Sequence, residues 1–149
     1  MILATVALTA VLALPATAPA QLGDPLENVK PKHDGSSLYL GEHYVKAHES
    51  IRQCITWHES RDAYDANTGT GKFRGAYQLS RDMGVGAGWM IQRDLRKTVS
   101  ATLAKEIGEH LRATVVNKWH PYWQDYAFWL VWDKGNGKSH WDSVRWCFA

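Results

Sequence analysis

The sequence has few of the features that mark metal proteins and nucleic-acid binders. It contains two cysteines in 149 residues, and they lie in neither a C-x-x-C nor a Cys/His pattern, which excludes the common zinc motifs. The sequence has 17 basic and 15 acidic residues, and the resulting net charge of +2 is too small for a protein that binds nucleic acid through a basic surface. The length fits one domain, and an apolar content of 45% excludes a disordered chain.

Two patterns that would supply a metal or a nucleotide site are incomplete. His58-Glu59 begins the metalloprotease pattern H-E-x-x-H, but Asp62 occupies the place of the second histidine. The three glycines within 84–88 follow no apolar strand and precede no Lys-Ser/Thr pair, which disfavours a phosphate-binding loop. We therefore expect no metal and no cofactor.

The N-terminal region lacks positive charge, since no lysine or arginine precedes Lys30. An apolar run over 2–14 leads to Ala18-Pro19-Ala20, the small-x-small pattern that signal peptidase cleaves. The run is short for a membrane span, which needs about 20 residues. The pattern predicts a signal peptide over 1–20 and export of the rest, with a retained anchor as the alternative. Either the true start lies upstream or the α-amino group supplies the missing charge.

The two cysteines, Cys54 and Cys147, are expected to form one disulfide if the protein is exported. The bond would close a loop of 93 residues, for which the chain-entropy treatment gives a stabilisation of about 4–5 kcal/mol. Two buried free thiols are the alternative.

The mature chain is expected to divide into a linker and one domain. Residues 21–41 are rich in Pro, Gly, Ser and Asp without a periodic apolar face, which predicts a flexible linker before a domain over 42–149. Apolar residues at helical spacing predict helices over 42–59 and 92–112. The stretch that starts at Pro121 is apolar on nearly all sides, which predicts the central buried helix.

The remaining segments favour turns and short strands. Residues 62–80 lose the helical period and contain the turn cluster Asn67-Thr68-Gly69-Thr70-Gly71, which predicts a hairpin or an irregular loop. The glycines within 84–88 predict a second loop. The expected fold class is α+β, mainly α, with a small β-hairpin or loop element.

Tryptophan is in excess, with eight residues that all lie after position 56. Indole rings pack against sugars as well as into cores, so the excess hints at a carbohydrate cleft. Trp89 is a candidate sugar platform, because a tryptophan in a glycine-rich loop has no periodic reason to be buried. Trp57, Trp129, Trp132 and Trp146 are expected to be core residues.

Glu59 is the strongest candidate for chemistry. It shares a helix face with Ile51 and Ile55, so partial desolvation should favour its protonated form. A carboxylic acid that stays protonated near neutral pH can donate a proton to a glycosidic oxygen. A surface salt bridge with Arg61 or Arg52 is the alternative that spacing alone leaves open.

Three motifs occur in order at short spacing: Cys54-Ile55-x-x-His58-Glu59-Ser60, the turn cluster at 67–71, and Gly75-Ala76-Tyr77-Gln78-Leu79-Ser80. Together they resemble the catalytic half of resuscitation-promoting factors and related transglycosylase-like domains of the lysozyme superfamily. The resemblance continues more faintly through Pro121, Gln124-Asp125 and Ala127 to Trp141 and Cys147, and in all it covers roughly residues 42–149. It implies a lysozyme-like fold in a secreted, cell-wall-associated monomer. The implied activity is cleavage of the β-1,4 bond between N-acetylmuramic acid and N-acetylglucosamine in peptidoglycan.

The resemblance also implies roles for individual residues. Glu59 matches the catalytic glutamate of the family, Gln78 matches a glutamine that lines the cleft beside it, and Tyr64 stands where an aromatic residue borders the sugar site. Core packing is the alternative role for Tyr64 and Tyr77, and satisfaction of buried backbone groups is the alternative for Gln78. The candidate substrate-binding residues are Gln78, Tyr77, Tyr64, Asn67, Thr68 and Trp89.

The sequence departs from the family pattern at two places. Trp132-Asp133 stand where lytic transglycosylases carry Tyr-Asn, and Cys54 lies five residues before the glutamate instead of next to it. No nearby aspartate matches a family position, which favours a mechanism in which Glu59 acts alone, first as acid and then as base. Hydrolysis and 1,6-anhydro formation both remain open. A wall-binding module that kept the fold without turnover is the alternative function.

Overall fold

The computed structural model describes residues 35–149, and the expected signal peptide and residues 21–34 of the expected linker lie outside this range. The described part is mainly helical with one two-stranded antiparallel sheet, as the sequence predicts. Its elements, in chain order, are η1 (Lys46–His48), α1 (Glu49–Ser60), β1 (Phe73–Arg74), β2 (Leu79–Ser80), α2 (Arg81–Leu95), α3 (Ala101–Ala113), η2 (Val116–Lys118), α4 (Pro121–Trp132), η3 (Asp133–Gly135) and η4 (Lys138–Cys147). None of the helices in 35–149 combines the length and the apolar character needed to cross a membrane.

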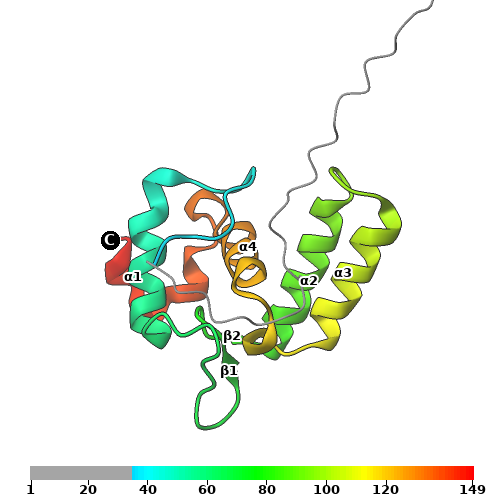
Figure 1. The fold of residues 1–149 in the computed structure, drawn as a ribbon. Coiled ribbons are helices and arrows are strands. Elements are labelled where there is room, and N and C mark those ends of the chain that lie inside the picture. Colours follow the sequence, from blue (N-terminus) through cyan, green and yellow to red (C-terminus); the bar gives the residue numbers. More distant parts are fainter. Residues whose placement is uncertain (1–34) are drawn as a thin grey trace, which may run out of the picture.

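Helix α4 is the centre of the fold, as its apolar sequence predicts. Figure 1 shows it between α1 and η4 on one side and the paired helices α2 and α3 on the other, with the β1–β2 hairpin at one end. Pro121 begins the helix, where its missing N–H costs nothing, and His120 caps it by accepting a hydrogen bond from the backbone N–H of Tyr122. The buried Phe128 contacts four other buried rings, those of Tyr77, Trp129, Trp132 and Trp141, which makes the core largely aromatic.

The disulfide between Cys54 and Cys147 is present, as predicted. It joins α1 to η4 across 93 residues of sequence and therefore closes almost the whole described domain into one loop. The bond places the C-terminal segment beside the end of α1 (Figure 1).

Two helix predictions were wrong in their bounds. The predicted helix over 42–59 starts only at Glu49, after a short 3-10 turn, and the predicted helix over 92–112 is two helices. Ser100 ends the connection between them, because its hydroxyl accepts a hydrogen bond from the backbone N–H of Leu103 and caps α3. The four-residue spacing of Leu95, Val99 and Leu103 continues across the connection between α2 and α3, so the apolar pattern alone does not reveal that the helix is interrupted.

The predicted glycine loop over 84–88 is part of helix α2. Its glycines allow close helix packing, since a Cβ at Gly84 would lie 2.6 Å from Val116 and one at Gly88 would lie 2.8 Å from Arg112. Ser80 starts the helix by accepting a hydrogen bond from the backbone N–H of Met83. The glycines therefore serve helix packing, and Trp89 is a helix residue.

Residues 35–41, which composition assigns to the linker, pack against the core. Tyr39 is 3% exposed and stacks on Tyr126, with ring centroids 4.1 Å apart. The buried Ser37 hydroxyl accepts a hydrogen bond from the indole N–H of Trp129 at 3.0 Å. The folded unit therefore includes residues before the expected boundary at 42.

Candidate functional site

Glu59 lies in the last turn of α1 and continues the helix face that is buried one turn earlier. Ile55 and Thr56, four and three residues before it, are almost fully buried, while Glu59 itself is half-buried. Its Oε1 atom accepts a hydrogen bond of 3.0 Å from the Ser143 hydroxyl of η4. Ser143 is exposed and this hydrogen bond is open to solvent, so the carboxylate lies at the surface beside the buried part of α1.

Three segments meet at this end of α1. The Ser60 hydroxyl donates to the carbonyl oxygen of Ala76 at 2.9 Å, which ties the helix end to the turn over 75–78. The indole N–H of Trp141, in η4, donates to the carbonyl oxygen of Tyr77 at 3.3 Å. Helix α1, the 75–78 turn and η4 are thus joined by side-chain hydrogen bonds next to Glu59, which fixes the surroundings of its carboxylate.

The 75–78 turn is held from the other side by α4. Gln124, fully buried, accepts a hydrogen bond from the backbone N–H of Ala76 at 3.0 Å and donates one to the carbonyl oxygen of Tyr64 at 2.9 Å. Gly75 has a φ of +77°, and a Cβ there would collide with the Gln124 side chain, so only glycine fits. Gln78 is half-buried with a φ of +49°, and its side-chain amide donates to the carbonyl oxygen of Gly75 at 2.8 Å.

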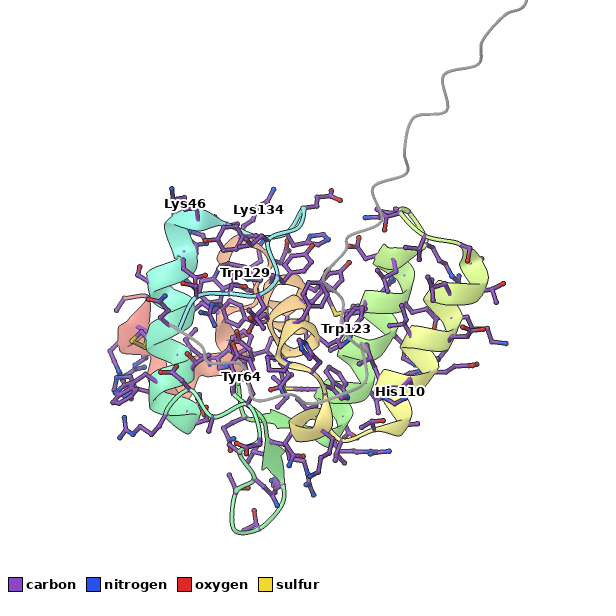
Figure 2. The ribbon with its side chains drawn as sticks, in the orientation of Figure 1. Lys46, Tyr64, His110, Trp123, Trp129 and Lys134 are labelled. Carbon is purple, nitrogen blue, oxygen red and sulfur yellow. A yellow bond between two sulfur atoms is a disulfide. The ribbon has the colours of Figure 1, made fainter. Side chains whose placement is uncertain are left out.

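Tyr64 and Tyr77 are core residues, 8% and 1% exposed. Both hydroxyls donate hydrogen bonds of 2.6 Å to the same carboxylate oxygen of Asp125, and Figure 2 shows Tyr64 in the interior of the fold. Neither ring has an exposed face on which a sugar could pack, so Tyr64 and Tyr77 are core residues, the alternative that the sequence left open.

The carboxylate of Asp125 joins four parts of the chain. It is fully buried in α4 and accepts hydrogen bonds from both tyrosines and, at 2.7 Å, from the backbone N–H of Leu38, while Arg52 of α1 lies 3.7 Å away. Arg52 is 1% exposed and also pairs with Glu49 at 2.7 Å. Burial raises the pKa of Asp125, although Arg52 and the hydrogen bonds act to lower it.

Asn67 and Thr68 lie in the hairpin that extends from this end of the molecule. Asn67 is exposed and forms a β-bridge with Arg74, and the Thr68 hydroxyl contacts the backbone of Phe73 at 3.2 and 3.3 Å. These contacts stabilise the hairpin itself.

Three tryptophans are more exposed than core residues would be. Trp57 and Trp146 are 52% and 59% exposed, so the expectation that they are core residues was wrong, whereas Trp129 and Trp132 are buried as predicted. Trp89 is 54% exposed on α2 and contacts Arg112 of α3, and helix α2 lies across α4 from α1, the helix that carries Glu59 (Figure 1).

Within residues 35–149, two groups of residues have the composition of a metal site, but neither arrangement suits a metal. Cys54 and Cys147 lie near His58, but their sulfur atoms are bonded to each other. In the group of Glu42, His43 and Asp94, the Asp94 carboxylate is already occupied by His43 at 2.9 Å, the Tyr126 hydroxyl at 2.5 Å and Lys97 at 2.6 Å.

Sequence reasoning missed both Ser143 and the Arg52–Asp125 network. A signal for Asp125 was present, because it is the one charged residue within 122–132, a stretch that is otherwise apolar apart from its neighbour Gln124. A charge in such a helix must find buried partners or be excluded from the core. Nothing local in the sequence singles out Ser143.

Comparison of the chain with protein-family models, with curated proteins and with solved structures gives no match.

Proposed function

We propose that this protein is an exported enzyme that cleaves the β-1,4 bond between N-acetylmuramic acid and N-acetylglucosamine in peptidoglycan. The observation that carries the proposal is the position of Glu59, a half-buried carboxylate at the junction of α1, the 75–78 turn and η4. The order of the Glu-Ser, Asn-Thr-Gly-x-Gly and Gly-x-Tyr-Gln motifs supports it, and the disulfide supports export.

In the proposed reaction Glu59 acts twice. As an acid it gives its proton to the glycosidic oxygen while the bond from that oxygen to the muramic C1 breaks. As a carboxylate it then takes a proton from the attacking hydroxyl group, which forms the new bond to C1. If the muramic 6-hydroxyl attacks, the product is a 1,6-anhydro sugar, and if water attacks, the product is the hydrolysed sugar.

The test is Glu59→Gln, assayed on purified peptidoglycan with mass spectrometry of the soluble products. Glutamine keeps the size of the side chain and can still accept the Ser143 hydrogen bond, but it cannot supply the proton, so lysis should be abolished while the circular dichroism spectrum is unchanged. Glu106→Gln, which changes an exposed glutamate in α3, is the matched control and should keep full activity.

Products about 18 mass units below the hydrolysed sugars identify the anhydro route, because no water is added. Full lytic activity in Glu59→Gln contradicts the proposal.

A non-catalytic glycan-binding module is the second candidate, and the exposed indoles of Trp57, Trp89 and Trp146 favour it. The same experiment separates the two functions. A binding module sediments with peptidoglycan and releases no soluble sugar, and its Glu59→Gln variant sediments to the same extent.

A further inference from the structure

Helix α2 carries a shallow groove on a part of the molecule that the proposed chemistry does not use. Trp89, Gln92, Arg93 and Arg96 line it, and we call it the Trp89 groove. Trp89, Arg93 and Arg96 are exposed along one stripe of the helix. Trp89 is 54% exposed, and an exposed indole beside arginine side chains is a surface that can bind a ligand.

The Trp89 ring is held in place by α3. The guanidinium of Arg112 lies over one face of the ring, 3.6 Å from its centroid. Arg112 is itself fixed, because its Nη1 atom donates a hydrogen bond of 2.7 Å to the side-chain oxygen of Gln92, which is 4% exposed. One face of the indole is therefore covered by Arg112, and the other faces solvent in a fixed orientation.

Two glycines leave the space that the Arg112 side chain occupies beneath Trp89. A Cβ at Gly88 would lie 2.8 Å from Cγ of Arg112, and a Cβ at Gly108 would lie 2.9 Å from its Nη1 and 2.5 Å from the oxygen of Gln92. A larger residue at either position would displace the arginine that orients Trp89. The platform thus depends on a packing arrangement between α2 and α3.

The groove is positively charged. Arg93 and Arg96 border the ring, and Arg112 lies beneath it. Within residues 35–149, none of these three arginines forms an ion pair with a carboxylate. The guanidinium groups of Arg93 and Arg96 can therefore receive an anion, and arginine binds phosphate and carboxylate with two parallel hydrogen bonds.

We propose that the Trp89 groove binds an anionic saccharide. The pyranose ring would pack its C–H face on the open face of Trp89, and its phosphate or carboxylate group would lie between Arg93 and Arg96. An exposed indole alone suits a neutral sugar and the arginines alone suit an inorganic anion, but the two together select a sugar that carries a negative charge. The site is independent of the proposed lytic activity, because none of its residues belongs to the junction around Glu59.

The test is an NMR titration of the purified protein that follows its tryptophan indole N–H signals. The signal lost in Trp89→Ala identifies Trp89. Two probes, N-acetylglucosamine 6-phosphate and glucuronic acid, distinguish a phosphate from a carboxylate as the anion, and N-acetylglucosamine and inorganic phosphate test the sugar and the anion separately. At least one anionic sugar should shift the Trp89 signal, with an affinity about tenfold or more above that of either separate part.

Variants locate the binding. Changing Arg93 and Arg96 together to glutamine should weaken the anionic sugar about tenfold or more. Arg61→Gln is the matched control, because Arg61 also stacks on an exposed tryptophan, Trp57, at 5.0 Å, and it should leave the affinity unchanged. The proposal is overturned if neither anionic sugar moves the Trp89 signal, if the neutral sugar or free phosphate binds as tightly, or if the arginine variant binds normally. Failure of the Glu59→Gln lysis test would leave this result unaffected.

Discussion

Replacement of Asp125 by alanine should be among the most destabilising single changes in the domain. The substitution removes the carboxylate that accepts hydrogen bonds from the hydroxyls of Tyr64 and Tyr77 and from the backbone N–H of Leu38, and it removes a charge partner from the buried Arg52. An unsatisfied buried polar group costs about 1–3 kcal/mol, and breaking a buried ion pair costs about 3–5 kcal/mol. Because the groups overlap and the structure relaxes, we expect a loss of about 4–5 kcal/mol in the free energy of unfolding.

Asp125→Asn gives a graded comparison. Its side-chain oxygen can still accept both tyrosine hydroxyls, but its amide nitrogen faces the N–H of Leu38, so only that bond and the charge are lost. We expect a loss of about 2–3 kcal/mol, which keeps a measurable folded state if the alanine variant does not fold.

Urea denaturation followed by far-ultraviolet circular dichroism measures these losses, with Asp142→Ala as the control. Asp142 is exposed in η4, and its replacement should change the stability by less than about 0.5 kcal/mol. If Asp125→Ala loses less than about 1 kcal/mol, or if the asparagine variant is less stable than the alanine variant, the hydrogen-bond reasoning is refuted.

Three further predictions concern other parts of the fold. Replacing Cys54 and Cys147 together by serine should lower the free energy of unfolding by about 4–5 kcal/mol, measured by urea denaturation, and an unchanged stability would contradict the role of the 93-residue loop. Gly108→Ala should destabilise the fold by about 1–3 kcal/mol, because the new Cβ would meet the Gln92 side chain. Gly86→Ala should stabilise it by about 0.5–1 kcal/mol, because a Cβ there has nothing within 4 Å and alanine favours the helix. Thermal melts that rank the two variants in the opposite order refute the packing argument. Burial acts to raise the pKa of Asp94, but hydrogen bonds from Lys97, Tyr126 and His43 outweigh it and lower the pKa to about 2. Since the pKa of Asp94 is lower in the folded than in the unfolded state, its carboxylate contributes stability above about pH 4, and this contribution is lost as the pH falls towards 2. The difference in free energy of unfolding between the wild type and Asp94→Asn, measured from pH 6 to about pH 2, should therefore shrink over that interval.

Local sequence signals predicted the helical elements better than their ends. Pro121 and the apolar residues after it gave both the start and the burial of α4, because a proline at the first helical position and an all-apolar surface are local properties. The break between α2 and α3 was missed because Leu95, Val99 and Leu103 keep a four-residue spacing across it. Ser100 was the available signal, since it caps α3.

The glycines of α2 show why composition alone misleads. Gly84 and Gly88 are typical of a loop in a sequence, but here they allow α2 to pack closely against Val116 and Arg112, which lie 32 and 24 residues further along the chain. That reason is a property of the folded state and has no local signature. The partners of Glu59 are non-local in the same way, since Ser143 is 84 residues away.

The inward packing of residues 35–41 has a practical consequence for protein engineering. An expression fragment that begins at Glu42, where the sequence alone places the domain boundary, would lack the ring that stacks on Tyr126 and the hydroxyl that accepts the indole proton of Trp129. It would also strip one donor from the buried carboxylate of α4. Such a fragment would leave part of the central helix α4 uncovered, so it should be less stable than the domain that includes residues 35–41.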